Sequence, residues 1–161
     1  MSNNNFHIMP EDLEKAVKYG HKVVVSRIIE QLDHINYCDF GTKTSLVMWA
    51  SAWGWTDLVT MLIDRGASFK SYCALGGETA LMTAAYHGRI DVVEVLLDRG
   101  AKVNQKDISG QTALRSAVLS QNWKILKTLM DKGGKYKSIL LTDTDVDWEQ
   151  VIPKDPDIPE N

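Results

Sequence analysis

The feature that most constrains the fold of this chain is a sequence unit that recurs about every 33 residues, a period found in solenoid repeats. Gly54 and Gly88 occupy the same place in successive copies of the unit, and so do Thr79 and Thr112. Several alanines and leucines keep the same spacing. Recurrence at a fixed period of this length is typical of solenoids, in which each unit packs mainly on its neighbours.

Within the most regular unit, residues 79–104, the pattern predicts two short helices. Gly88 and Gly100 stand where the two helices should end, and Asp91 stands near the positive N-terminal end of the second helix. The apolar residues of these helices are Leu81, Ala84, Ala85, Val92, Val93, Leu96 and Leu97. Such short helices are marginal alone, because helix nucleation is costly, so each unit needs its neighbours.

This unit resembles the ankyrin repeat. TALMTAAYHGRIDVVEVLLDRGAKVN, residues 79–104, is similar to the family pattern T-P-L-H-x-A-A-x-x-G followed by V-x-x-L-L and G-A-x-x-N. Residues 45–69 are a second good copy, and residues 110–134 are a weaker copy in which Gln121 replaces the glycine between the helices. A fourth copy, residues 11–31, resembles an N-terminal cap. The resemblance implies an all-α, ankyrin-like helical-repeat solenoid of about four repeats.

We expect three parts along the chain: a flexible N-terminus over residues 1–10, an ankyrin repeat domain over 11–137, and an acidic, proline-containing tail over 138–161. The expected repeats are about 11–38, 39–73, 74–106 and 107–137. Apolar residues favour a C-terminal capping role for 138–152, with a loose end at 153–161. Acidic residues that alternate with apolar ones leave a second interpretation, a mimic of an acidic ligand that competes for the binding groove.

Composition and charge limit the function classes. The net charge of −3 and the pI of about 5.8 argue against a surface that holds nucleic acid. No apolar run approaches the roughly 20 residues that a membrane span needs, and the start MSNNNFHIMP lacks the apolar core of a signal peptide. Cys38 and Cys73 fit a reduced intracellular protein better than a disulfide scaffold. We therefore expect a cytoplasmic monomer that is not secreted through a classical signal peptide.

Motifs for catalysis, nucleotide binding and metal binding are missing from the sequence, so we expect no enzyme, no cofactor and no metal site. Asp143, Asp145 and Asp147 alternate like metal ligands, but no glycine or distal glutamate completes a calcium loop. The resemblance adds one remote alternative. Asn104 matches the turn asparagine that an asparaginyl hydroxylase modifies in some ankyrin proteins, so the chain could be a substrate of that modification. The same remote alternative includes an uncommon enzyme built on this fold.

Candidate binding residues come from the turns and first helices, which line a concave face in ankyrin-like proteins. Tyr19, Trp53 and His87 share one register of successive units, and aromatic residues of this kind anchor protein interfaces. Tyr19 and Trp53 could instead pack between helices, and Trp49 could either face the groove or pack. The candidate partner-binding residues are Tyr19, Trp49, Trp53, Tyr72, Leu75, Tyr86, His87, Lys106, Ile108, Ser109 and Leu119.

These observations predict a protein–protein interaction module. It would act as an adaptor, scaffold or regulator that binds a partner protein through the concave groove and the turn loops. An alternative is a dedicated inhibitor, such as an immunity protein or a pathogen effector, that blocks a partner enzyme. Groove residues vary by design, so the sequence does not identify the partner.

Overall fold

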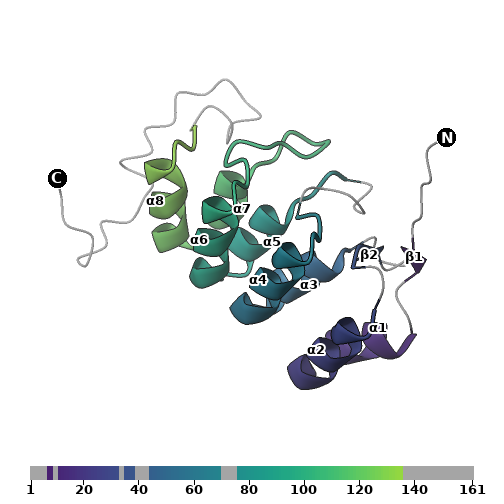
Figure 1. Cartoon of the computed structure of the whole chain (residues 1–161). Helices are drawn as coiled ribbons and strands as arrows, with labels where there is room; N and C mark the ends of the chain where they lie inside the picture. The colour runs from purple at the N-terminus through teal and green to yellow at the C-terminus, as the bar shows by residue number, and fades with distance from the viewer. Residues whose placement is uncertain (1–6, 9–10, 33–34, 39–43, 70–75, 136–161) are drawn as a thin grey trace.

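A computed structural model describes residues 7–8, 11–32, 35–38, 44–69 and 76–135 (Figure 1). These residues form four pairs of antiparallel helices and one short pair of strands. The elements are β1 (His7–Ile8), α1 (Glu11–Lys18), α2 (Lys22–Glu30), β2 (Tyr37–Cys38), α3 (Leu46–Trp53), α4 (Thr56–Asp64), α5 (Ala80–Tyr86), α6 (Ile90–Asp98), α7 (Ala113–Leu119) and α8 (Trp123–Asp131). The pairs follow one another in chain order, which confirms the predicted helical-repeat solenoid.

Hydroxyl side chains begin the first helix of the second, third and fourth pairs. Ser45, Thr79 and Thr112 have extended backbone conformations, and each side-chain oxygen accepts a hydrogen bond from the backbone N–H three residues later. The donor–acceptor distances are 3.2, 3.3 and 3.4 Å, in chain order. Such caps satisfy a backbone donor that the helix leaves without an internal partner. The same residue type at one place in the repeat therefore starts the same helix three times.

The turn between the two helices of each pair requires a positive φ. Gly20, Gly54 and Gly88 adopt φ values of 74°, 75° and 70° there. In the fourth pair this position is occupied by Gln121, with a φ of 58°. Its conformation confirms that Gln121 replaces the interhelical glycine, at a cost of roughly 1–2 kcal/mol for a residue with a Cβ.

Side chains from the next repeat cover these turns. The Arg89 side chain lies over Gly54, where its Cδ would be 2.9 Å from an added Cβ, and Arg89 Nε donates to the carbonyl oxygen of Ala52 at 2.9 Å. Asn122 lies over Gly88 in the same way, with its Oδ1 2.8 Å from an added Cβ. Glycine is therefore needed at these turns both for its backbone conformation and for the close approach of the next repeat.

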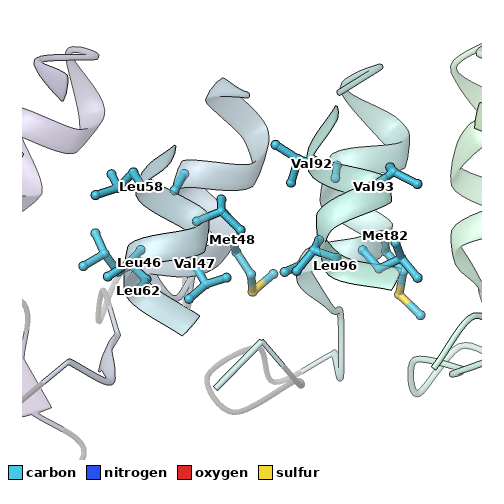
Figure 2. Close-up of a cluster of buried hydrophobic side chains, with 14 of the residues drawn as sticks. Leu46, Val47, Met48, Leu58, Leu62, Met82, Val92, Val93 and Leu96 are labelled. Carbon is cyan, nitrogen blue, oxygen red and sulfur yellow. The ribbon is translucent and has the colours of Figure 1, made fainter. Parts of the chain in front are cut away.

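One continuous apolar core runs through the four pairs. Figure 2 shows its part in the second and third pairs. The first helices α3, α5 and α7 pack against one another in succession, and the second helices α4, α6 and α8 do the same. Leu62, Leu96 and Leu129 occupy equivalent places in the second helices, and all three side chains are fully buried. The predicted apolar face of the second helix is thus confirmed as the surface that closes each repeat onto its neighbours.

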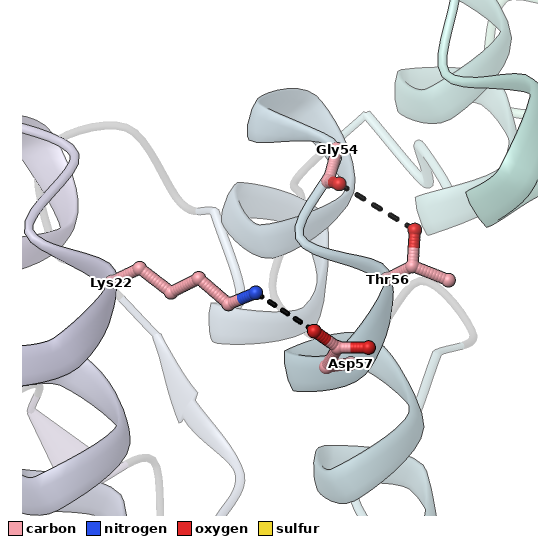
Figure 3. A network of polar contacts seen from close by, with 4 residues as sticks. All are labelled: Lys22, Gly54, Thr56 and Asp57. Atoms are coloured by element: carbon pink, nitrogen blue, oxygen red, sulfur yellow. Dashed lines mark hydrogen bonds and ion pairs between the residues drawn. The ribbon is translucent and has the colours of Figure 1, made fainter.

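Exposed ion pairs link successive second helices at the surface. They are Lys22–Asp57, Arg99–Asp64 and Lys132–Asp98. The Lys22 ammonium lies 2.9 Å from Asp57 Oδ2 (Figure 3), beside Thr56, whose hydroxyl donates to the carbonyl oxygen of Gly54 at 3.5 Å. Because solvent and salt screen such pairs, they contribute little to stability, and the core holds the repeats together.

A short parallel strand pair brings the N-terminal segment back to the end of the first repeat. His7 pairs with Tyr37, and Ile8 pairs with Cys38. Within the expected flexible N-terminus over residues 1–10, His7 and Ile8 thus have backbone partners. No local pattern predicts a two-residue strand, because its pairing depends on a partner that lies a whole helix pair away along the chain.

Cys38 is disulfide-bonded, so the expectation of reduced cysteines is wrong at this position. The number of cysteines carries no information about the distances between them in the fold, which decide whether a bond can form. Cys73 lies outside the described residues. Disulfides are typical of oxidising compartments, so this bond does not support the expected cytoplasmic location.

The acidic tail, residues 138–161, also lies outside the described residues, together with both of its interpretations and its three alternating aspartates. In the described part of the chain, no helix combines the length and the apolar character that a membrane crossing requires.

Candidate functional site

A cavity of about 260 Å³ lies between the first helices of the third and fourth pairs. Met82 and Tyr86 of α5 form one wall, and Ser116 and Leu119 of α7 form the other. Helices α5 and α7 lie next to each other in the stack (Figure 1) and pack closely. Three further lining residues, Glu78, Asp107 and Gln111, come from the turns that precede these helices.

The cavity is built from equivalent positions of two successive repeats. Glu78 and Gln111 share one place in the repeat, and each directly precedes the residue that caps the following helix. Tyr86 and Leu119 share another place, and each is the last residue of its helix. The repeat thus places one residue at the start and one at the end of each first helix on the same face.

Apolar surface at the mouth of the cavity is open to solvent. Tyr86 is 54% exposed and Leu119 is 57% exposed, whereas Met82 is buried at the base. Both exposed side chains stand on helices whose other faces are packed in the core. Exposed apolar side chains on a rigid support are the kind of surface that partner proteins cover.

The turn before α7 is organised around one carboxylate. Asp107 Oδ1 accepts hydrogen bonds from the backbone N–H of Ser109 at 2.9 Å, from its hydroxyl at 2.8 Å, and from the backbone N–H of Gln111 at 2.8 Å. These bonds leave Ile108 at the tip of the turn, where 80% of its surface is exposed. Asp107 therefore both shapes the turn and brings negative charge to the cavity.

The turn before α5 is joined to the turn before α7. The backbone N–H of Ile108 donates to the carbonyl oxygen of Gly76 at 2.8 Å. Gly77, with a φ of 70°, lies beside this turn, where an added Cβ would be in ordinary contact with Asp107 Cα at 3.5 Å. This contact sets Glu78 and Asp107 on neighbouring turns, so that both carboxylates line one cavity.

The structure places the predicted site residues in three groups. Eight are exposed: Tyr19, Trp53, Tyr86, His87, Lys106, Ile108, Ser109 and Leu119. Of these, the cavity brings together only Tyr86 and Leu119. Trp49 is half-buried and packs against the core. Tyr72 and Leu75 lie outside the described residues.

The aromatic register of Tyr19, Trp53 and His87 differs from the register that lines the cavity. The Trp53 ring stacks on the Trp55 ring, with centroids 6.0 Å apart and planes at 16°. It also lies 3.7 Å from where a Cβ of Gly20 would stand, so it covers the turn of the preceding repeat. Trp53 remains 41% exposed, but this packing supports the alternative in which it lies between helices.

Five lining residues escape the sequence-based prediction: Glu78, Met82, Asp107, Gln111 and Ser116. Glu78 and Gln111 could have been found, because they share one place in the repeat and directly precede the helix caps. Asp107 gives no such signal, since it enters the cavity only through the contact between two turns. Met82 is a buried core residue that also lines the cavity.

The cavity is lined by both polar and apolar side chains. Its lining residues include two carboxylates, one phenol and one serine, but no histidine, cysteine or lysine. The Ser116 hydroxyl donates to the carbonyl oxygen of Thr112 at 3.4 Å and so meets no base. Among the described residues, no group of three or more histidines, cysteines, aspartates or glutamates is gathered for a metal ion.

Comparison with known proteins identifies the repeat. A family model described as ankyrin repeats, in three copies, matches residues 70–139. A rice protein (Oryza sativa subsp. japonica) with the name "Probable E3 ubiquitin-protein ligase XBOS33" is 37% identical over 81 residues. That match covers 48% of this chain and 15% of the rice protein. Residues 70–139 thus match ankyrin repeats, which form a helical-repeat solenoid and indicate a protein–protein interaction module.

Proposed function

We propose that this protein is an adaptor, scaffold or regulator that binds a partner protein through a groove formed by its first helices and their preceding turns. The observation that carries the proposal is the cavity between α5 and α7, with Tyr86 and Leu119 exposed at its mouth. Equivalent residues of successive repeats line it, so the fold itself presents these side chains on one face.

The packed helices and joined turns that carry the exposed side chains of the groove favour binding. The helices that carry Tyr86 and Leu119 pack in the core, and their preceding turns are joined by a backbone hydrogen bond. A preformed surface loses little conformational entropy when a partner docks, which leaves more of the contact energy for affinity. Exposed aromatic and apolar side chains in such a place are typical interface anchors.

We propose that the chain has no catalytic activity of its own, because the residues that line the cavity do not pair a nucleophile with a base. The rice relative's name describes a protein of which this match covers 15%. The number of partners distinguishes the possible roles. Several partners would indicate an adaptor, whereas a single stoichiometric enzyme partner would indicate a dedicated inhibitor.

A capture experiment with matched variants tests the proposal. The tagged chain is compared with a groove variant, Tyr86→Ala with Leu119→Ala, and with a control variant, Glu94→Ala with Lys127→Ala, whose exposed residues lie on the second helices α6 and α8. Partners should be captured by the parent and the control but lost with the groove variant. Partners that survive the groove variant, in a protein that melts like the parent, would contradict the proposal.

A further inference from the structure

We propose that the cavity between α5 and α7 receives an arginine side chain from the partner, flanked in the partner by apolar residues. This inference rests on the proposed function, because it names the chemistry of the segment that would occupy the groove. It is carried by three features of the same place: the charge of the lining, the shape of the cavity and the apolar surface around it.

The charge of the lining is wholly negative. Glu78 and Asp107 are the acidic residues that line the cavity, and neither Lys106 nor Arg115 is among the lining residues, although both are near in sequence. Glu78 is exposed, and its Oε1 accepts one hydrogen bond, from the Thr83 hydroxyl at 3.3 Å. A cationic group would therefore meet carboxylate oxygens with free acceptor capacity.

Asp107 keeps acceptor capacity as well. The three hydrogen bonds that shape its turn all end on Oδ1. Within the described part of the chain, Oδ2 accepts none. The turn thus fixes the carboxylate and leaves its second oxygen for a ligand. Because the same bonds hold the side chain in place, little side-chain entropy is lost when a cation binds.

The shape of the cavity suits one long side chain. Its volume of about 260 Å³ is below the roughly 300–1,000 Å³ of most small-molecule sites. Met82 at the base and Leu119 at the mouth offer apolar surface to an aliphatic stem. The exposed ring of Tyr86 offers a face on which a planar guanidinium can stack. Arginine satisfies all three contacts better than lysine, whose ammonium is a strongly hydrated point charge.

Exposed apolar side chains stand at the mouth of the cavity and on the turn that contributes Asp107 to it. Ile108 projects from the turn next to Asp107, and Leu119 projects from the end of α7. Residues that flank the arginine in the partner would cover these side chains, so we expect them to be apolar. The protein's own acidic tail is a poor occupant, because residues 138–161 contain seven acidic residues and no arginine. The occupant is therefore a segment of another protein.

Titration with small peptides tests the inference directly. The probe is N-acetyl-Leu-Arg-Leu-amide, and its matched control carries citrulline, which has nearly the same shape as arginine but no charge. Binding to the full isotope-labelled chain is followed by nuclear magnetic resonance. The arginine probe should shift the backbone amide signals of Tyr86, Gln111 and Leu119, and the citrulline probe should bind more weakly by about fivefold or more. Added salt should weaken the arginine probe alone.

Two glutamate variants make the test specific. Glu78→Gln should lower the affinity for the arginine probe by about fivefold and leave the citrulline probe unchanged. Glu94→Gln, a change at another exposed glutamate on α6, should alter neither affinity. Both variants should melt like the parent, since neither side chain lies in the core.

The outcomes separate this inference from the proposed function. Equal binding of the two probes, an unchanged affinity in Glu78→Gln, or no shift at the three amides would overturn the arginine site. If a captured partner is nevertheless lost with the Tyr86 and Leu119 variant, the groove still binds proteins by other contacts. If that partner also survives the groove variant, the proposed function fails as well.

Discussion

The third helix pair, in the middle of the stack, and the first pair, at its end, share one sequence pattern but differ in packing. Helix α5 packs against both α3 and α7, whereas α1 meets the stack through α3 alone among the first helices. In the first pair, Val24 of α2 is 48% exposed, while Val92, at the same place in α6, is fully buried. The next residues, Val25 and Val93, are fully buried in both pairs.

This difference shows what a neighbour on each side contributes. A middle repeat packs its apolar surface against a neighbouring repeat on each side. An end repeat has only one neighbouring repeat, so no repeat covers its other face. The candidate groove lies in the well-packed part of the molecule, where rigid helices support exposed side chains. The end pair also makes polar contacts with the second pair at its surface, such as Lys22–Asp57 and the bond from Arg65 Nη1 to the carbonyl oxygen of Ile29 at 2.7 Å.

The largest expected effect is on the core of the middle pair. Leu96→Ala should lower the free energy of unfolding by roughly 2–5 kcal/mol, because it removes a fully buried side chain between repeats. Its matched control, Val24→Ala on α2, should change stability by no more than about 0.5 kcal/mol, since that side chain is half exposed. Chemical unfolding of both variants checks the comparison. Equal losses would show that the end pair is packed as tightly as the middle.

Two glycine variants test whether the close approach of the next repeat requires glycine at the turn. Gly54→Ala and Gly66→Ala both place a Cβ at positive φ, which costs roughly 1–2 kcal/mol. Only Gly54 is covered by a neighbour, Arg89, while an added Cβ at Gly66 would meet no atom within 4 Å. Gly54→Ala should therefore cost about 1 kcal/mol more, through the displaced arginine and its lost hydrogen bond. Thermal unfolding of the pair measures the difference, and identical midpoints would remove the role of Arg89.

The fourth pair offers a stabilising variant of the same turn. Gln121→Gly should raise the free energy of unfolding by about 1 kcal/mol, because glycine adopts the positive φ of 58° without a clash at Cβ. Chemical unfolding measures the gain against Gln105→Gly, a change at an exposed loop residue for which the structure assigns no positive φ. A loss of stability in Gln121→Gly would show that its side chain makes a contact worth more than the strain.

The smallest expected effect is on the surface of the first pair. Lys22→Ala should change the free energy of unfolding by less than about 1 kcal/mol, because both partners of its ion pair with Asp57 are exposed. The effect should shrink further in high salt, which screens the pair. A loss comparable with that of Leu96→Ala would mean that polar contacts, rather than the core, hold the first pair to the stack.

The helices and the buried core could be predicted from the sequence, because they depend on the spacing of apolar residues and on the period of the repeat. Apolar residues at helical spacing predict the buried face that includes Leu96, and the turn position of Gln121 follows from its alignment with Gly88. The β1–β2 pairing does not follow, since two-residue strands carry no pattern of their own. The same limit applies to Asp107, which reaches the cavity through a contact between the turns of two different repeats.

The candidate site is predictable only in part, for a geometric reason. Alignment of the repeats shows which residues share a place in the repeat. Whether their side chains face the groove or a neighbouring repeat depends on how the repeats stack. The register of Tyr86 and Leu119 lines the cavity, as expected for a binding face. The next register, one residue later, carries Trp53 over Gly20 of the preceding repeat. A shift of one residue along a helix therefore separates a side chain that lines the cavity from one that covers the preceding turn.

The most direct test of the account is the affinity of the captured partner for two matched variants, measured by calorimetry with thermal unfolding alongside. Tyr86→Ala combined with Leu119→Ala should weaken binding by about 2 kcal/mol or more and leave the unfolding midpoint unchanged. Trp53→Ala should do the reverse, lowering the midpoint with a smaller effect on affinity, because its ring covers the preceding turn. If the double variant binds as tightly as the parent, or if only Trp53→Ala abolishes binding, the groove between α5 and α7 is not the binding site.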